Sequence, residues 1–261
     1  MFEAAVEAVS RLRAICERDG CDAVVAAATS AVRDASNGGD FCKAVAERCG
    51  VDVRVLSGEE EAMVVWLGAR AALDLGPGPC ALFDLGGGST EFVLGDVAEV
   101  TLAASVPVGH HRVAASVPLS APTTAAERKA VERWVWRRVR PITRSIREKG
   151  YTNLILCGGT TRILARMIAR QRGLPEAASH GLHIDVDELE ALVLRLSELT
   201  PDALVQVPGA DPRRRHTLVP GALAALTMVR SLRAQRVIAC DAALRRGLVE
   251  AWHTGVLAAA K

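Results

Sequence analysis

The stretch Phe83-Asp84-Leu85-Gly86-Gly87-Gly88-Ser89-Thr90-Glu91 decides how the rest of this chain is interpreted. The apolar run 80–85 predicts a buried strand that ends just past an aspartate. Three glycines then predict a tight turn, and a second strand begins at once near Glu91. Because a strand and not a helix follows the glycines, the turn is neither a Rossmann loop nor a Walker loop.

The glycine turn has the chemistry of an anion-binding site. Glycine tolerates positive φ and lets the backbone approach a ligand closely. Successive N–H groups in such a turn form an anion-binding concavity. We therefore expect phosphate to bind at Gly86, Gly87, Gly88 and Ser89. The flanking carboxylates of Asp84 and Glu91 have the ligand type of a divalent metal site. The alternative is a plain glycine hairpin.

A second glycine turn, Cys157-Gly158-Gly159-Thr160-Thr161, follows a predicted strand at 153–157 and opens a predicted helix. Its amides and helix dipole favour a phosphate or nucleotide group, which makes Gly158, Gly159 and Thr160 candidate phosphate ligands. Close packing of the strand on the helix is the alternative for these glycines.

Two segments before residue 62 add charged candidates. In Ser57-Gly58-Glu59-Glu60-Glu61, three carboxylates lie at a predicted helix N-terminus. They compensate the helix dipole, or one of them acts as a general base for water. In A-T-S-A-V-R-D-A-S-N (28–37), Arg33 follows a strand end and could clamp phosphate oxygens. Its alternative is a surface pair with Asp34 or Asp40.

The order of predicted elements is typical of an α/β protein. Helix, strand, helix, strand and helix alternate over 3–75, and Gly76-Pro77-Gly78-Pro79 is the clearest break. Three antiparallel strands follow, and helices dominate from 123 onward. This pattern predicts two α/β lobes, 1–78 and 79–241.

Composition narrows the function. Aromatic residues make up 3% of the 261 residues, which disfavours single-stranded nucleic acid as a partner. Seven cysteines without a C-x-x-C spacing disfavour zinc. We see neither a signal peptide nor a membrane-spanning apolar run, and expect a cytoplasmic protein. Arginines at 137–147 and 213–215 suit a polyanion or a solvated helix face. His110 and His111 would diverge on a strand, which favours surface or hinge roles over a metal pair.

These motifs, in this order, resemble the exopolyphosphatase and guanosine pentaphosphate phosphohydrolase (Ppx/GppA phosphatase) family of the actin-like ATPase superfold. The matching segments cover essentially the whole chain. The specific ones are L-S-G-E-E-E-A and D-L-G-G-G-S-T-E-F-V-L-G, and the supporting ones are A-T-S-A-V-R-D-A-S-N-G, S-V-P-V-G, C-G-G-T-T-R-I-L-A, V-P-G-A-L-A and C-D-A-A-L-R-R-G-L-V-E.

The resemblance implies two actin-like, ribonuclease H-like domains flanking a cleft, with the C-terminal helix 242–261 packing back on the first. It implies Mg²⁺-dependent release of terminal phosphate from polyphosphate or pppGpp (guanosine pentaphosphate), and a homodimer. By position, Asp84 and Glu91 would engage Mg²⁺ and phosphate. Glu61 resembles the residue that activates water, with Glu60 as the second choice, and Arg33 resembles a phosphate-contacting arginine.

One departure from the family pattern bears on activity. Members usually open with a strand and a D-x-G-S-N-S-type turn that forms a first phosphate loop, and no such segment occurs here. We therefore expect an incomplete first domain, from a late start or a genuine loss. A non-catalytic polyphosphate- or alarmone-binding protein stays open as the alternative function, and an actin-like small-molecule kinase is a third.

Overall fold

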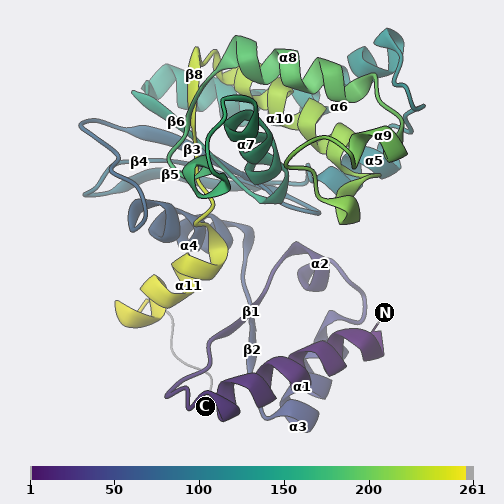
Figure 1. Ribbon diagram of the computed structural model, residues 1–261. Coiled ribbons are helices and arrows are strands. Elements are labelled where there is room, and N and C mark those ends of the chain that lie inside the picture. Colours follow the sequence, from purple (N-terminus) through teal and green to yellow (C-terminus); the bar gives the residue numbers. More distant parts are fainter. Residues whose placement is uncertain (1, 257–261) are drawn as a thin grey trace.

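The computed structural model describes residues 2–256 and is built around a six-stranded mixed sheet (Figure 1). The strand order is β5-β4-β3-β6-β8-β7, in which β3, β6 and β8 are parallel and their neighbours antiparallel. The strands are β3 (Cys80–Leu85), β4 (Thr90–Gly95), β5 (Val100–Val106), β6 (Asn153–Cys157), β7 (His183–Asp185) and β8 (Arg236–Ala239).

Both faces of this sheet are covered, which explains why β3 and β4 are mostly apolar and buried at every position. Phe83 and Leu85 face a core shared with the helices on one side. Leu82 and Val93 face α4 (Gly58–Arg70) on the other side. The helices that follow β5 are α5 (His110–Ser116), α6 (Ala125–Lys149), α7 (Gly159–Gln171), α8 (Val186–Ser197), α9 (Pro201–Leu204) and α10 (Leu218–Leu232), with short 3-10 turns at Glu176–Ser179 and Pro212–Arg214.

A much smaller sheet is built from the first third of the chain. The strands β1 (Ala26–Ala28) and β2 (Val53–Val55) pair in parallel. The helices α1 (Phe2–Arg18) and α3 (Gly38–Cys49) pack together beside them around Val6, Val45 and Val51. The short helix α2 (Ser30–Arg33) follows β1 and turns the chain toward the larger sheet (Figure 1).

The helices α4 and α11 (Leu244–His253) cross in close contact. Glycines allow this approach: a Cβ at Gly247 would lie 1.8 Å from the carbonyl oxygen of Val64, and a Cβ at Gly68 would lie 2.3 Å from that of Ala243. The C-terminal helix therefore returns to a helix that lies before β3 in the sequence.

The predicted elements agree with the structure in most places. The strands at 80–85 and 153–157 have the predicted bounds, and Gly50 ends α3 in the left-handed conformation as expected. The helix predicted to run from 59 to 75 ends at Arg70. Strand β7 was not predicted.

The prediction that His110 and His111 lie on a strand is wrong. They begin helix α5, because Gly109 turns the chain after β5 and the following residues are helical. Their rings lie 4.3 Å apart between centroids, and His110 is buried.

Among the described residues, the structure contains no helix that is both long and apolar enough to cross a membrane.

Candidate active site

Asp84 and Glu91 lie directly opposite each other on β3 and β4. Opposed residues in an antiparallel pair project to the same face of the sheet. Both side chains are buried, and burial followed by the charge of Glu61 raises the pKa of Asp84 to about 7. The same two causes, in the same order, raise the pKa of Glu91 to about 8. The register of one hairpin thus creates a buried carboxylate pair.

Glu61 reaches this pair from α4 and is itself only 8% exposed. Its Oε2 accepts a hydrogen bond of 3.0 Å from Nη1 of Arg33, which also donates to the carbonyl oxygen of Leu56 at 2.6 Å. Burial raises the pKa of Glu61, and the Arg33 guanidinium opposes that shift. Arg33 therefore pairs with the predicted general base across 28 residues of sequence. It also lies 4.0 Å from Asp34, one partner of the alternative prediction, and does not pair with Asp40.

Glu60, the second candidate base, caps the N-terminus of helix α4. Its carboxylate accepts from the backbone N–H of Ser57, whose hydroxyl in turn accepts from the backbone N–H of Glu60, so the two form a capping box. Glu60 also pairs with Arg54 at 2.5 Å. The Ser57 amide and then Arg54 lower its pKa. The geometry thus favours Glu61 over Glu60 as the residue that faces the buried carboxylates.

The turn at residues 86–88 needs glycine for a reason other than the positive φ that we predicted. Gly86, Gly87 and Gly88 do not take positive φ; what they provide is space. A Cβ at Gly88 would lie 2.4 Å from Oγ of Ser30, and a Cβ at Gly109 would lie 2.2 Å from the carbonyl oxygen of Gly87. The turn is therefore clamped between α2 and the start of α5.

His110 is a residue of this site that sequence reasoning missed. Its Nδ1 lies 2.7 Å from the carbonyl oxygen of Gly86, and its Nε2 lies 3.1 Å from Nη1 of Arg214. The carbonyl requires a proton on Nδ1, and the guanidinium requires a lone pair on Nε2, so the ring is held neutral. Burial and then Arg214 lower the pKa of His110 to about 4, in agreement with this assignment. The only sequence signal was its position two residues after Val108.

The two glycine turns meet at one cavity of about 600 Å³. Gly158, with φ of 106°, passes so close to Asp84 that a Cβ there would lie 2.7 Å from Oδ1. Arg214 lies over Gly159, where a Cβ would be 2.4 Å from Nη2. The cavity lining includes Asp84, Gly86, Gly87, Gly158 and Gly159 together with Arg162, Arg214, Arg245 and Arg246.

Some predicted residues lie beside this cavity but do not line it. Gly88 packs on Ser30, and Ser89 is buried. Thr160 is also buried: its Oγ1 has no hydrogen-bond partner, and a Cβ at Gly221 of α10 would lie 2.8 Å away from it. The Thr160 hydroxyl thus faces the helix layer, whereas Gly158 and Gly159 face the cavity.

Asp84 and Glu91 are compatible with a Mg²⁺ ion whose remaining ligands come from water and substrate. The described residues contain no cluster of three or more His, Cys, Asp or Glu side chains that would form a metal site alone. Mg²⁺ commonly takes one or two carboxylates and completes its shell with waters and phosphate oxygens. The buried pair of Asp84 and Glu91 fits that pattern, because it presents two carboxylates from adjacent strands on one face of the sheet.

Comparisons with known proteins agree with this fold. The profile of the Ppx/GppA phosphatase family matches residues 1–254. Exopolyphosphatase 1 of Mycobacterium leprae (strain TN) is 29% identical over 247 residues, which cover 94% of this chain and 72% of that protein. Exopolyphosphatase 1 of Mycobacterium tuberculosis (strain ATCC 25618 / H37Rv) is 28% identical over 94% of this chain and 71% of its own length.

Two crystal structures show the same architecture at lower sequence identity. An exopolyphosphatase from Cytophaga hutchinsonii superposes with a TM-score of 0.91 at 21% identity, covering 97% of this chain and 82% of that one. A Ppx/GppA family member from Aquifex aeolicus gives 0.84 at 21% identity, covering 98% and 82%. These similarities confirm the predicted α/β fold and show that it is the one found in Ppx/GppA family members.

Fold and site together define a hydrolase-type α/β protein in which two glycine turns and the buried Asp84 line one cavity. The chain belongs to the Ppx/GppA phosphatase family.

Proposed function

We propose that this chain is a Mg²⁺-dependent phosphoanhydride hydrolase that releases terminal phosphate from inorganic polyphosphate, with pppGpp as a second candidate substrate. The observation that carries the proposal is the convergence of Glu61 with the buried pair of Asp84 and Glu91, next to the cavity between the two glycine turns. Family membership and the exopolyphosphatase names of its relatives support the reaction class.

Glu61 is the residue suited to take a proton from the attacking water. Its pKa is raised toward the working range of a general base by burial. Arg33 is hydrogen-bonded to it and holds the carboxylate in one orientation. Replacing the acid by its amide would keep this shape and remove the base.

Asp84 and Glu91 would hold Mg²⁺, which when bound supplies positive charge to the phosphoanhydride oxygens. Gly86, Gly87, Gly158 and Gly159 line the cavity where the phosphates would lie. Arg162 and Arg214 line the same cavity, and their guanidinium groups suit bidentate contacts to phosphate oxygens.

The direct test is phosphate release from long-chain polyphosphate with Mg²⁺ for the parent, Glu61→Gln and Glu60→Gln. We expect Glu61→Gln to lose about 10²- to 10⁴-fold in rate. Glu60→Gln should keep most of the rate and lose some helix stability, because it caps α4. Far-UV circular dichroism checks that both variants fold.

Equal rates for Glu61→Gln and the parent would remove the general-base role. Binding of polyphosphate by the parent without any release at any Mg²⁺ concentration would favour the binding-only alternative. A parallel assay with pppGpp ranks the two substrates.

A further inference from the structure

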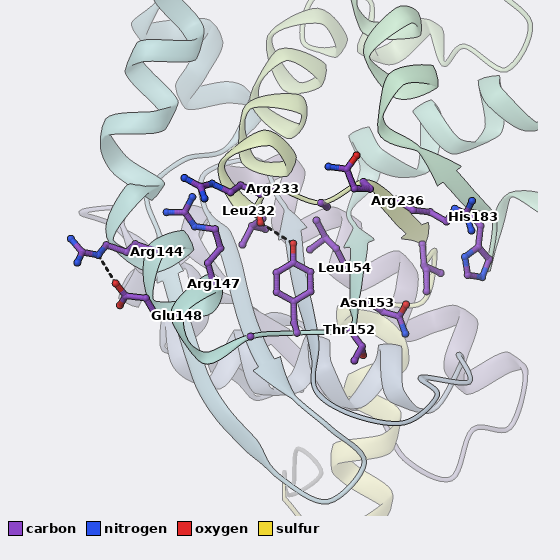
Figure 2. A pocket seen from close by; sticks show the side chains of 15 residues that line it. Arg144, Arg147, Glu148, Thr152, Asn153, Leu154, His183, Leu232, Arg233 and Arg236 are labelled. Carbon is purple, nitrogen blue, oxygen red and sulfur yellow. Dashed lines mark hydrogen bonds and ion pairs between the residues drawn. The ribbon is translucent and has the colours of Figure 1, made fainter.

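A second concavity lies at the other end of the six-stranded sheet, away from the candidate active site (Figure 2). It has a volume of about 710 Å³ and is lined by the ends of α6 and α10 and the starts of β6 and β8. Asn153 lies in its lining at the start of β6, whereas Cys157 at the end of that strand precedes the second glycine turn. About 13 Å of strand therefore separates the two cavities.

The lining is strongly basic. It carries four arginines and a histidine: Arg144, Arg147, Arg233, Arg236 and His183. Glu148 is the one carboxylate among the lining residues, and it pairs with Arg144 at 2.7 Å.

Two of the arginines lack an ion-pair partner. Arg236 pairs with Asp185 at 2.9 Å. Arg147 and Arg233 have no carboxylate within 4.0 Å among the described residues. Figure 2 shows both arginines among the side chains that line the cavity.

The neighbouring carboxylates and helix dipoles neutralise only part of the positive charge of these arginines. The helices α6 and α10 end beside the cavity, and each C-terminus carries about half a negative charge. Four arginines less the carboxylates of Glu148 and Asp185 leave a formal charge of +2. The two helix ends reduce it to roughly +1. A net positive charge remains for a ligand.

Arg233 also has an unfavourable backbone. It is the only non-glycine residue of the described chain with positive φ, at 62°. It closes α10 at a position where Gly50, also at 62°, closes α3. Glycine adopts this conformation without the steric cost that an arginine incurs. Folding alone therefore favours glycine at 233, and the arginine side chain must serve something that it contacts.

We propose that this cavity is a second anion site that binds a short inorganic phosphate chain. Arginine forks match phosphate oxygens, and four of them around one cavity exceed what a single phosphate needs. Tyr151 is the one aromatic residue of the lining, and its hydroxyl donates to the carbonyl oxygen of Leu232. The choice of a phosphate chain therefore rests on the arginines. The inference depends on the proposed function only in choosing a phosphate chain as the polyanion.

The test is calorimetric titration of tripolyphosphate into the Glu61→Gln protein and into the same protein carrying Arg147→Gln and Arg233→Gly. We expect two tripolyphosphate sites in the first protein and one in the second. The affinity of the arginine-lined cavity should fall about 10- to 100-fold in the second protein. The matched control carries Arg137→Gln and Arg140→Gln, which remove two charges from an exposed part of α6, and should keep both sites.

A further readout separates binding from a structural role. Arg233→Gly alone should melt at or above the temperature of the parent, because glycine relieves the strained backbone. A lower melting temperature, or unchanged tripolyphosphate stoichiometry in the double variant, would overturn the proposal. The protein that carries Arg147→Gln and Arg233→Gly with Glu61 intact should release phosphate at the rate of the parent. A failure of the hydrolase proposal can therefore be told apart from a failure of the second-site proposal.

Discussion

Both sheets of the molecule pack against helices, but their strands are buried to very different extents. In the large part, built on the six-stranded sheet, β3 and β4 are buried at all twelve positions. In the small part, residues 2–56, β1 and β2 have one buried position in six. The strands of the large sheet are packed on both faces and form a hydrophobic core. The small sheet mainly serves to position Arg33. The comparison suggests that the large part provides stability and the small part completes the site.

The largest effect should come from removing one link between the two parts, the bond from Arg33 to Glu61. Replacing Arg33 by methionine removes the hydrogen bonds to Glu61 and to Leu56. We expect phosphate release to fall about 10²- to 10³-fold, the cost of losing one electrostatic contact in an active site. Arg48→Met, which removes the exposed pair with Glu3 inside the small part, is the control and should change the rate little. Equal losses in both variants would contradict the assignment.

A core deletion in each part should separate their stabilities. Leu82→Ala in β3 should lower the free energy of unfolding by about 2–5 kcal/mol. Val45→Ala in α3 should lower it less, and its effect should appear as faster hydrogen exchange of the β1 and β2 amides while the β3 amides are unchanged. If exchange rises equally in both sheets, the molecule unfolds as one unit and the comparison fails.

Glycines in the two parts should respond in opposite directions to a methyl group. Gly109→Ala would place a Cβ 2.2 Å from the backbone of Gly87, and we expect a loss of about 1–3 kcal/mol together with lower activity. Gly39→Ala lies in α3, where a Cβ meets nothing within 4 Å. That variant should be neutral or more stable by up to about 1 kcal/mol. Thermal melts of both variants provide the measurement.

The last effect concerns the dependence of stability on pH. The folded pKa of His110 is lowered from 6.5 to about 4, so the unfolded chain binds a proton between these values that the folded protein does not. Stability from the neutral ring is complete above pH 6.5 and is lost as the pH falls toward 4, at no more than about 1.4 kcal/mol per pH unit. His110→Gln should flatten this slope in urea titrations. The exposed His183→Gln should leave it unchanged, and a steep slope in both would show that other groups cause it.

Part of the site could be predicted from local sequence. The apolar run through Leu82 and Phe83 predicted the strand, and three glycines predicted the turn after Asp84. The pairing of Asp84 with Glu91 follows from the hairpin register, which the length of the turn determines. His110 could not be found in this way, because its partners at Gly86 and Arg214 are 24 and 104 residues distant.

The sequence by itself determined the fold family, the strand bounds at 80–85 and 153–157, and the residue types that can handle phosphate, because these depend on local periodicity and on motif chemistry. Only the tertiary structure decided between Glu60 and Glu61. Adjacent residues on a helix point about 100° apart, so one of them caps the helix and the other faces the buried carboxylates. The position of α4 on the sheet makes that choice, and no local pattern encodes it.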